Sequence, residues 1–132
     1  MKANVAVFIS GLGLLLAAVP ALAHHSFNAE FDAKNPLKLT GVVTKIEWKN
    51  PHAYFYMDVK DESGRVTNWG FELTSPNALM RLGWTRNSLK VGAEVTVEGS
   101  RAKDKSPIGN TTSVVLSTGQ KLFAGSSQEQ TP

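Results

Sequence analysis

The chain has 132 residues, a formal net charge of +3 at pH 7 and no cysteine. This length suits a single domain, and the absence of cysteine excludes disulfide bonds, thiolate metal sites and a cysteine nucleophile. The charge is small and spread evenly along the chain, so it predicts neither a nucleic acid nor an anionic membrane as the partner.

Residues 1–23 have the pattern of a secretory signal peptide. Lys2 precedes an apolar and small-residue segment from Val5 to Val19, and Ala21 and Ala23 occupy the small-residue positions before a cleavage site. The segment is shorter than the roughly 20 apolar residues of a membrane-spanning helix. We therefore expect cleavage after Ala23 and a mature, non-spanning protein in the periplasm or outside the cell.

Residues 24–36 ("HHSFNAEFDAKNP") show no clear hydrophobic period, so we expect them to form an N-terminal arm. Phe27 and Phe31 lie four positions apart, which is the spacing of one helical turn docked on a core. Glu30 and Asp32 are either oxygen ligands or part of a solvated, charged face.

The first strand is expected to begin at Leu37. Its apolar residues change phase half-way along, which predicts a bulge at Gly41 that bends the strand without exposing its apolar side. The residues expected on the inner face are Leu37, Leu39, Val42, Ile46 and Trp48.

Two further strands are predicted at about residues 53–60 and 66–73, because apolar and polar residues alternate there. The "DESG" turn joins them. The residues expected on the inner face are Phe55, Met57, Val59, Thr67, Trp69, Phe71 and Leu73. The three strands together predict a meander.

A short helix follows, and its ends are marked by sequence signals. Ser75 is the predicted N-cap, Pro76 the first helical residue and Gly83 the stop. After a loop, a strand with Val95 and Val97 inside is expected, then a strand in "TTSVVLS" and a hairpin return in "TGQKLF".

The order of elements predicts an all-β fold with one short helix. It matches a small five-stranded OB-like Greek-key barrel (β-β-β-α-β-β) over residues 37–123, preceded by the cleaved signal peptide and the arm. Residues 124–132 are polar and are expected to be a disordered tail. Another small β-sandwich or meander with one helix remains an alternative.

The mature sequence contains five distinctive blocks: "HHSFNAEFD", "LTGVVTKIEWKNPH", "NWGFEL", "SPNALMRLGWTRNSLKVGAEVTVEG" and "KLFAG". Together they resemble a family of short exported bacterial proteins known only as a domain of unknown function. The resemblance covers about residues 24–126. It implies export and a single small β-rich domain, and it implies no activity.

The three histidines of the chain are candidate metal ligands. His24 would begin the mature protein, so its α-amine and imidazole can chelate one ion, and imidazole nitrogens favour copper(II) among the late transition metals. His52 lies in a loop of the kind that binds ligands in OB barrels. The sequence predicts a site for copper or another late transition metal at His24, His25 and His52. The alternative is a solvated terminus and a hydrogen-bonded His52 in a proline turn.

The outer face of the second and third strands is the second candidate site. Alternation places Tyr54, Tyr56, Asn68 and Glu72 together on this face. Tyrosines beside an amide and a carboxylate suit a small organic ligand or a protein partner. The alternative is that the tyrosines stabilise the strands without any ligand.

No motif for hydrolytic catalysis is present, so we do not expect an enzyme. The sequence predicts a monomeric, exported, non-catalytic binding protein, with copper held by the mature N-terminal histidines as the sharpest hypothesis. The alternatives are a metal-free module that binds a small ligand through the tyrosine face, and an accessory subunit that contacts an envelope protein. A nucleic acid partner is not expected, because the chain lacks a basic groove.

Overall fold

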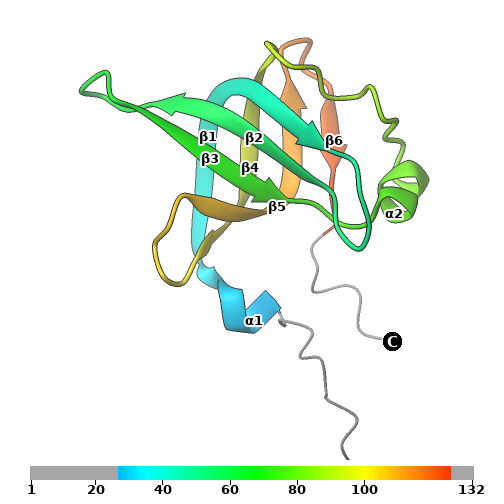
Figure 1. Cartoon of the computed structure of the whole chain (residues 1–132), viewed down its shortest axis with the longest axis horizontal. Helices are drawn as coiled ribbons and strands as arrows, with labels where there is room; N and C mark the ends of the chain where they lie inside the picture. The colour runs from blue at the N-terminus through cyan, green and yellow to red at the C-terminus, as the bar shows by residue number, and fades with distance from the viewer. Residues whose placement is uncertain (1–26, 126–132) are drawn as a thin grey trace, which may run out of the picture.

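The structure is a computed structural model that describes residues 27–125. Two helices and six strands occupy this range, as drawn in Figure 1. In chain order they are α1 (Phe27–Glu30), β1 (Phe31–Glu47), β2 (Tyr54–Lys60), β3 (Val66–Glu72), α2 (Pro76–Arg81), β4 (Glu94–Ala102), β5 (Ile108–Leu116) and β6 (Lys121–Phe123). The predicted signal peptide, His24 and His25, and residues 126–132 of the predicted tail lie outside the described residues.

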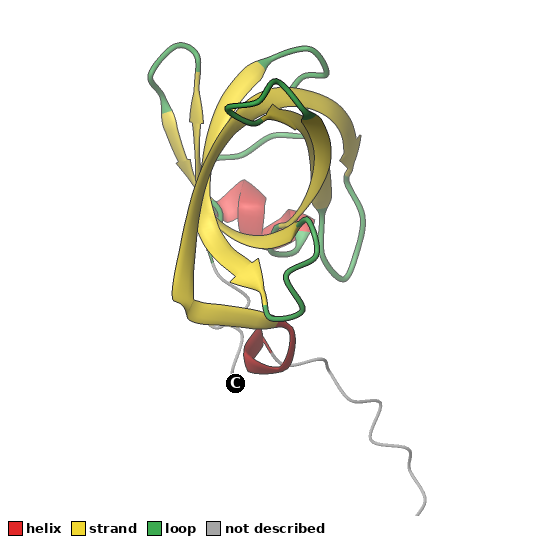
Figure 2. Ribbon diagram, turned by 90° about the vertical axis from the view of Figure 1, so that its left-hand side faces the viewer, coloured by secondary structure: helices red, strands yellow, loops and turns green. Residues whose placement is uncertain are grey.

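The strands form one sheet that closes on itself. Neighbours pair antiparallel in the order β3-β2-β1-β4-β5-β6, and β3 also pairs in parallel with β5. Figure 2 shows the resulting ring almost end-on. This path is the Greek-key arrangement of an OB barrel, so the predicted fold class is confirmed. The predicted hairpin return supplies β6, which extends the sheet beside β5.

The first strand differs from the prediction in its start and in its bulge. It starts at Phe31, because part of the expected arm pairs with β4. The register against β2 shifts between Val43 and Lys45, so a bulge at Gly41 was wrong. Val43 is buried and Val42 is exposed, which also corrects the predicted inner face.

Gly41 has a different role. It lies where β1 passes from pairing with β4 to pairing with β2. A Cβ atom at this position would collide with the main-chain carbonyl group of Asp58 in β2. The glycine therefore allows a close approach of two backbones, which is the other common reason for a glycine within a strand.

The second and third strands follow the predicted alternation. Phe55, Met57 and Phe71 point inward and are fully buried, and the rings of Phe55 and Phe71 stack with their centres 5.2 Å apart. The main core cluster consists of Val43, Ala53, Phe55, Met57, Phe71, Leu73, Leu79, Trp84, Leu89, Val95, Val97, Val114, Leu122 and Ala124.

The predicted helix is confirmed as α2. The Ser75 hydroxyl accepts a hydrogen bond from the Ala78 N–H at 3.3 Å, Pro76 opens the helix, and Gly83 has a φ of +95° beyond its end. Leu79 is fully buried in the core. The helix thereby covers one opening of the barrel, where it is visible through the ring in Figure 2.

Both ends of the described chain belong to the folded domain. Phe27 and Phe31 form a small buried cluster with Ala102, with the two ring centres 5.6 Å apart, so the helical turn predicted in the arm is present. Ala124 is buried and its N–H donates to the Thr112 carbonyl at 2.9 Å. The core thus includes Ala124, which was expected to begin the tail. Neither helix within residues 27–125 is long and apolar enough to cross a membrane.

Candidate functional site

The structure places five of the seven predicted site residues. His52 lies in the loop between β1 and β2, Tyr54 and Tyr56 lie on β2, and Asn68 and Glu72 lie on β3. Tyr54 pairs directly with Glu72 across the two strands, whereas Asn68 pairs with Asp58, closer to the turn that joins the strands. The other two residues, His24 and His25, lie outside the described residues.

Glu72 is the centre of a cluster at one end of the barrel. Its side chain is only 8% exposed, although it lies on the outer face of β3. Its Oε1 atom lies 2.6 Å from the Nδ1 atom of His52. Burial raises the pKa of the Glu72 carboxyl, and the Glu30 carboxylate of α1 raises it further, while His52 acts in the opposite direction. The imidazole of His52 is therefore held by a buried carboxylate.

Tyr54 belongs to the same cluster. Burial, together with the nearby Glu72 and Glu30 carboxylates, raises the pKa of its hydroxyl to about 12. A hydrogen bond to Glu72 contributes to this shift. The Lys49 ammonium lies 5.6 Å from the centre of the Tyr54 ring. The tyrosine is therefore engaged by its own protein at both its hydroxyl and its ring.

Tyr56 packs against the sheet in a similar way. Its ring lies beside Gly70 of β3, where an added Cβ would be 3.1 Å from the nearest ring atom. The Lys45 ammonium lies 5.5 Å from the ring centre. Lys45 and Lys49 both bind Glu47, at 2.7 and 2.8 Å, and these contacts hold the pKa of the Glu47 carboxyl at about 2.

Asn68 does not join the Glu72 cluster. Its amide nitrogen donates to Asp58 at 2.9 Å and to Thr44 at 3.0 Å, which links three neighbouring strands. The site predicted on the outer face of β2 and β3 is thus divided into two parts. His52, Tyr54 and Glu72 come together at one end, and Asn68 stabilises the sheet at the other.

The described residues do not form a metal site by themselves. Within residues 27–125, no three histidine, aspartate or glutamate side chains lie close enough together to hold an ion. His52 is the only one of the three predicted ligands in this range. The copper site at His24, His25 and His52 therefore stays a prediction.

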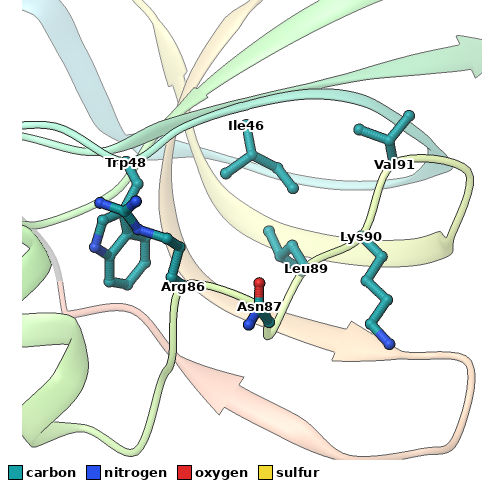
Figure 3. A pocket seen from close by; sticks show the side chains of 7 residues that line it. All are labelled: Ile46, Trp48, Arg86, Asn87, Leu89, Lys90 and Val91. Carbon is teal, nitrogen blue, oxygen red and sulfur yellow. The ribbon is translucent and has the colours of Figure 1, made fainter.

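The sequence did not predict a groove that lies on another part of the barrel. It has a volume of about 500 Å³ and lies between the end of β1 and the loop that leads from α2 to β4 (Figure 3). The side chains that line it are Ile46, Trp48, Arg86, Asn87, Leu89, Lys90 and Val91. Only the alternation of Leu89 and Val91 with Lys90 in the "LKV" segment marked it in the sequence.

A comparison with known protein families identifies the family of this chain. The family of unknown function DUF6152 matches residues 12–112. The chain belongs to this family. The range matched by DUF6152 contains all three histidines, both tyrosines, Asn68 and Glu72. No curated protein sequence matches the chain.

Solved structures with a similar fold come from other proteins. Two crystal forms of Rim1, a mitochondrial single-stranded DNA binding protein from S. cerevisiae, match with TM-scores of 0.49 and 0.48 at 12% identity. These matches cover 63% and 69% of this chain, and 92% and 96% of Rim1. The ZRD-deleted mutant of TiaS in complex with agmatine matches with a TM-score of 0.42 at 24% identity, over 74% of this chain and 24% of TiaS. These similarities are too low to transfer a function to the DUF6152 protein.

Proposed function

We propose that the protein is an exported, non-catalytic binding protein that holds copper(II), or another late transition metal, at the end of the barrel where His52 lies. The ligands are the α-amine and imidazole of His24 and the imidazoles of His25 and His52. The observation that carries the proposal is the 2.6 Å contact between His52 and the buried Glu72.

This contact supports metal binding for a chemical reason. A histidine that binds a metal through one ring nitrogen usually donates its other N–H group to a carboxylate or a carbonyl. Such a partner orients the ring and makes it a better ligand. Glu72 acts on Nδ1 of His52, so Nε2 is the nitrogen assigned to the metal.

The position of α1 supports the participation of the two other histidines. Glu30 of α1 lies close enough to Glu72 and Tyr54 to raise both pKa values. His25 precedes Phe27, the first residue of α1, by two positions, which corresponds to about 7 Å of extended chain. The helix α1 therefore lies near the end of the barrel that carries His52.

Export is part of the same proposal, because the amine ligand exists only after cleavage in front of His24. The signal-peptide pattern of residues 1–23 supports this step. It is tested by isolating the protein from the periplasm and measuring its intact mass. A first residue other than His24 would contradict the proposed chelate.

The tyrosine face is a weaker candidate for the binding site. Tyr54 is engaged by Glu72 and Lys49, and Tyr56 packs beside Gly70 under Lys45. These contacts favour a role in stabilising the sheet. Lys45 and Lys49 also share the carboxylate of Glu47, which reduces the positive charge that this face offers to a nucleic acid.

Isothermal titration of copper(II) and zinc(II) into the mature protein tests the metal site. We expect one copper ion to bind with a submicromolar Kd. The substitution His24→Ala, or the substitution His52→Ala, is expected to weaken binding at least about tenfold, because each removes an imidazole ligand. Tyr56→Phe is the matched control and is expected to leave copper binding unchanged, because Tyr56 lies outside the cluster of His52, Tyr54 and Glu72.

The opposite pattern would redirect attention to the sheet face. If copper binds weakly and neither histidine substitution has an effect, the metal proposal is wrong. Recovery of a stable complex with an envelope protein, which is lost on Tyr54→Ala and Tyr56→Ala, would instead support an accessory role for the tyrosine face.

A further inference from the structure

The groove shown in Figure 3 has no part in the proposed metal site. It shares no residue with the cluster of His52, Tyr54 and Glu72. Its volume of about 500 Å³ lies within the range of small-molecule sites, roughly 300 to 1,000 Å³. Its size therefore suits a small ligand.

The floor of the groove is apolar. Ile46, near the end of β1, and Trp48, which follows this strand, are partly buried and pack against the main core. Leu89 from the facing loop belongs to that core. Val91 is 66% exposed at the rim. A ligand that covers this floor would remove apolar surface from water, which favours binding.

Two cations border the floor. Figure 3 places Arg86 at the end of the groove near Trp48, and Lys90 at the end near Val91. Within residues 27–125, neither side chain makes an ion pair with a carboxylate. Other lysines of the barrel do so, for example Lys38 and Lys121 with Glu98. The groove therefore carries positive charge that the surrounding protein leaves uncompensated.

The loop that carries these cations is held in place by its own hydrogen bonds. The Thr85 N–H donates to the Ser88 hydroxyl at 2.8 Å, and the Asn87 N–H donates to the Thr85 hydroxyl at 3.2 Å. Further along, main-chain hydrogen bonds of 2.8 and 2.9 Å join Gly92 and Ala93 to Val43 of β1. A groove that is formed before the ligand arrives loses little conformational entropy on binding.

We propose that this groove binds a small amphipathic carboxylate. The carboxylate pairs with the Arg86 guanidinium, whose planar fork of N–H groups matches its two oxygens. The apolar body lies along Trp48, Ile46 and Leu89, and Lys90 adds a second positive charge at the rim. This site is independent of the metal proposal, since it uses neither the histidines nor the tyrosine face.

Isothermal titration with decanoate tests the site, with decyltrimethylammonium as a probe of equal chain length and opposite charge. We expect one decanoate to bind per protein and the cationic probe to bind at least about tenfold more weakly, because only the carboxylate can accept charge-assisted hydrogen bonds from Arg86. Arg86→Gln is expected to lose about tenfold in decanoate affinity, and Lys90→Gln to lose less.

Two further variants separate recognition from general charge effects. Arg86→Lys keeps the positive charge and removes the planar fork. We therefore expect its affinity for decanoate to lie between the affinities of the wild type and of Arg86→Gln. Arg65→Gln removes an exposed arginine next to the turn between β2 and β3, and it is expected to bind like the wild type. Equal binding of the two probes, no binding of decanoate, or an unchanged affinity in Arg86→Gln would overturn the proposal.

Discussion

At the scale of single residues, Glu72 combines an outward position on its strand with a buried side chain. His52, Tyr54 and Glu30 all act on its carboxyl group. A buried carboxyl is stabilised in its protonated form, because the charged form loses its hydration. The cluster therefore makes the stability of the protein depend on pH.

The sign of this dependence follows from the raised pKa of Glu72. The folded protein binds this proton more tightly than the unfolded chain does, so the contribution to stability is present at low pH and is lost as pH rises through the raised pKa. We expect the free energy of unfolding of the wild type, relative to Glu72→Gln, to fall as pH rises above about 4, the ordinary pKa of a glutamate carboxyl. Urea unfolding at several pH values measures this difference.

Glu62→Gln is the control for that experiment. Glu62 lies in the exposed turn between β2 and β3, so this substitution is expected to keep the pH dependence of the wild type. Parallel stability curves for the wild type and Glu72→Gln would show that the Glu72 proton does not contribute.

At the scale of the elements, the pairing of β4 with β5 depends on a close approach of two backbones. The register of this pair shifts between Glu98 and Gly99. A Cβ atom on Gly99 would collide with the carbonyl oxygen of Asn110 in β5. A main-chain atom in the middle of a ladder cannot move aside without breaking its own hydrogen bonds.

We therefore expect Gly99→Ala to lower the free energy of unfolding by about 2 kcal/mol or more, as in other overpacked sites. Gly70→Ala is the matched control, because its Cβ would meet the side chain of Tyr56, which can rotate away. A loss below about 1 kcal/mol is expected there. Urea unfolding followed by circular dichroism measures both values, and equal losses would contradict the explanation.

The elements differ in how well the sequence predicted them. The alternation in β2 and β3 and the cap signals of α2 act over a few neighbouring residues, so these elements were predicted correctly. The bulge in β1 was placed at Gly41 instead of next to Thr44. A glycine within a strand marks either a bulge or a close backbone contact, and only the position of the neighbouring strand distinguishes the two.

The candidate site was predicted in part for a similar reason. Strand alternation was enough to place Tyr54 and Glu72 side by side on one face. The contact of Glu72 with His52 and its burial depend on how the loop before β2 and the turn of α1 lie against the sheet. The groove was missed because Arg86 and Lys90 occupy an irregular segment, where no period relates them to β1.

At the scale of the whole molecule, α1 and the start of β1 are joined to the barrel at several points. Phe31 is only 3% exposed and packs against Phe27 and Ala102, and the Lys103 N–H donates to the Glu30 carbonyl at 2.9 Å. The start of the described chain is therefore expected to unfold together with the barrel in one transition.

Phe31→Ala tests this cooperativity. We expect a loss of about 3 kcal/mol in the free energy of unfolding, because the substitution removes a buried aromatic side chain. Phe123→Ala serves as control, since Phe123 is 60% exposed and its loss is expected to cost less than about 1 kcal/mol. A stability of Phe31→Ala equal to that of the wild type would mean that this segment does not contribute to the folded unit.

The divided pairing of β1 has a consequence for the order in which a growing chain can fold. The second half of the strand meets its partner β2 soon after it emerges, whereas the first half must wait for β4. During that interval its edge is open, and open edges invite pairing with other chains. The first half of β1 contains Lys34, Pro36 and Lys38. Lysine and proline are residue types that oppose such pairing. The nascent chain thus carries its own protection against aggregation in the segment that stays unpaired longest.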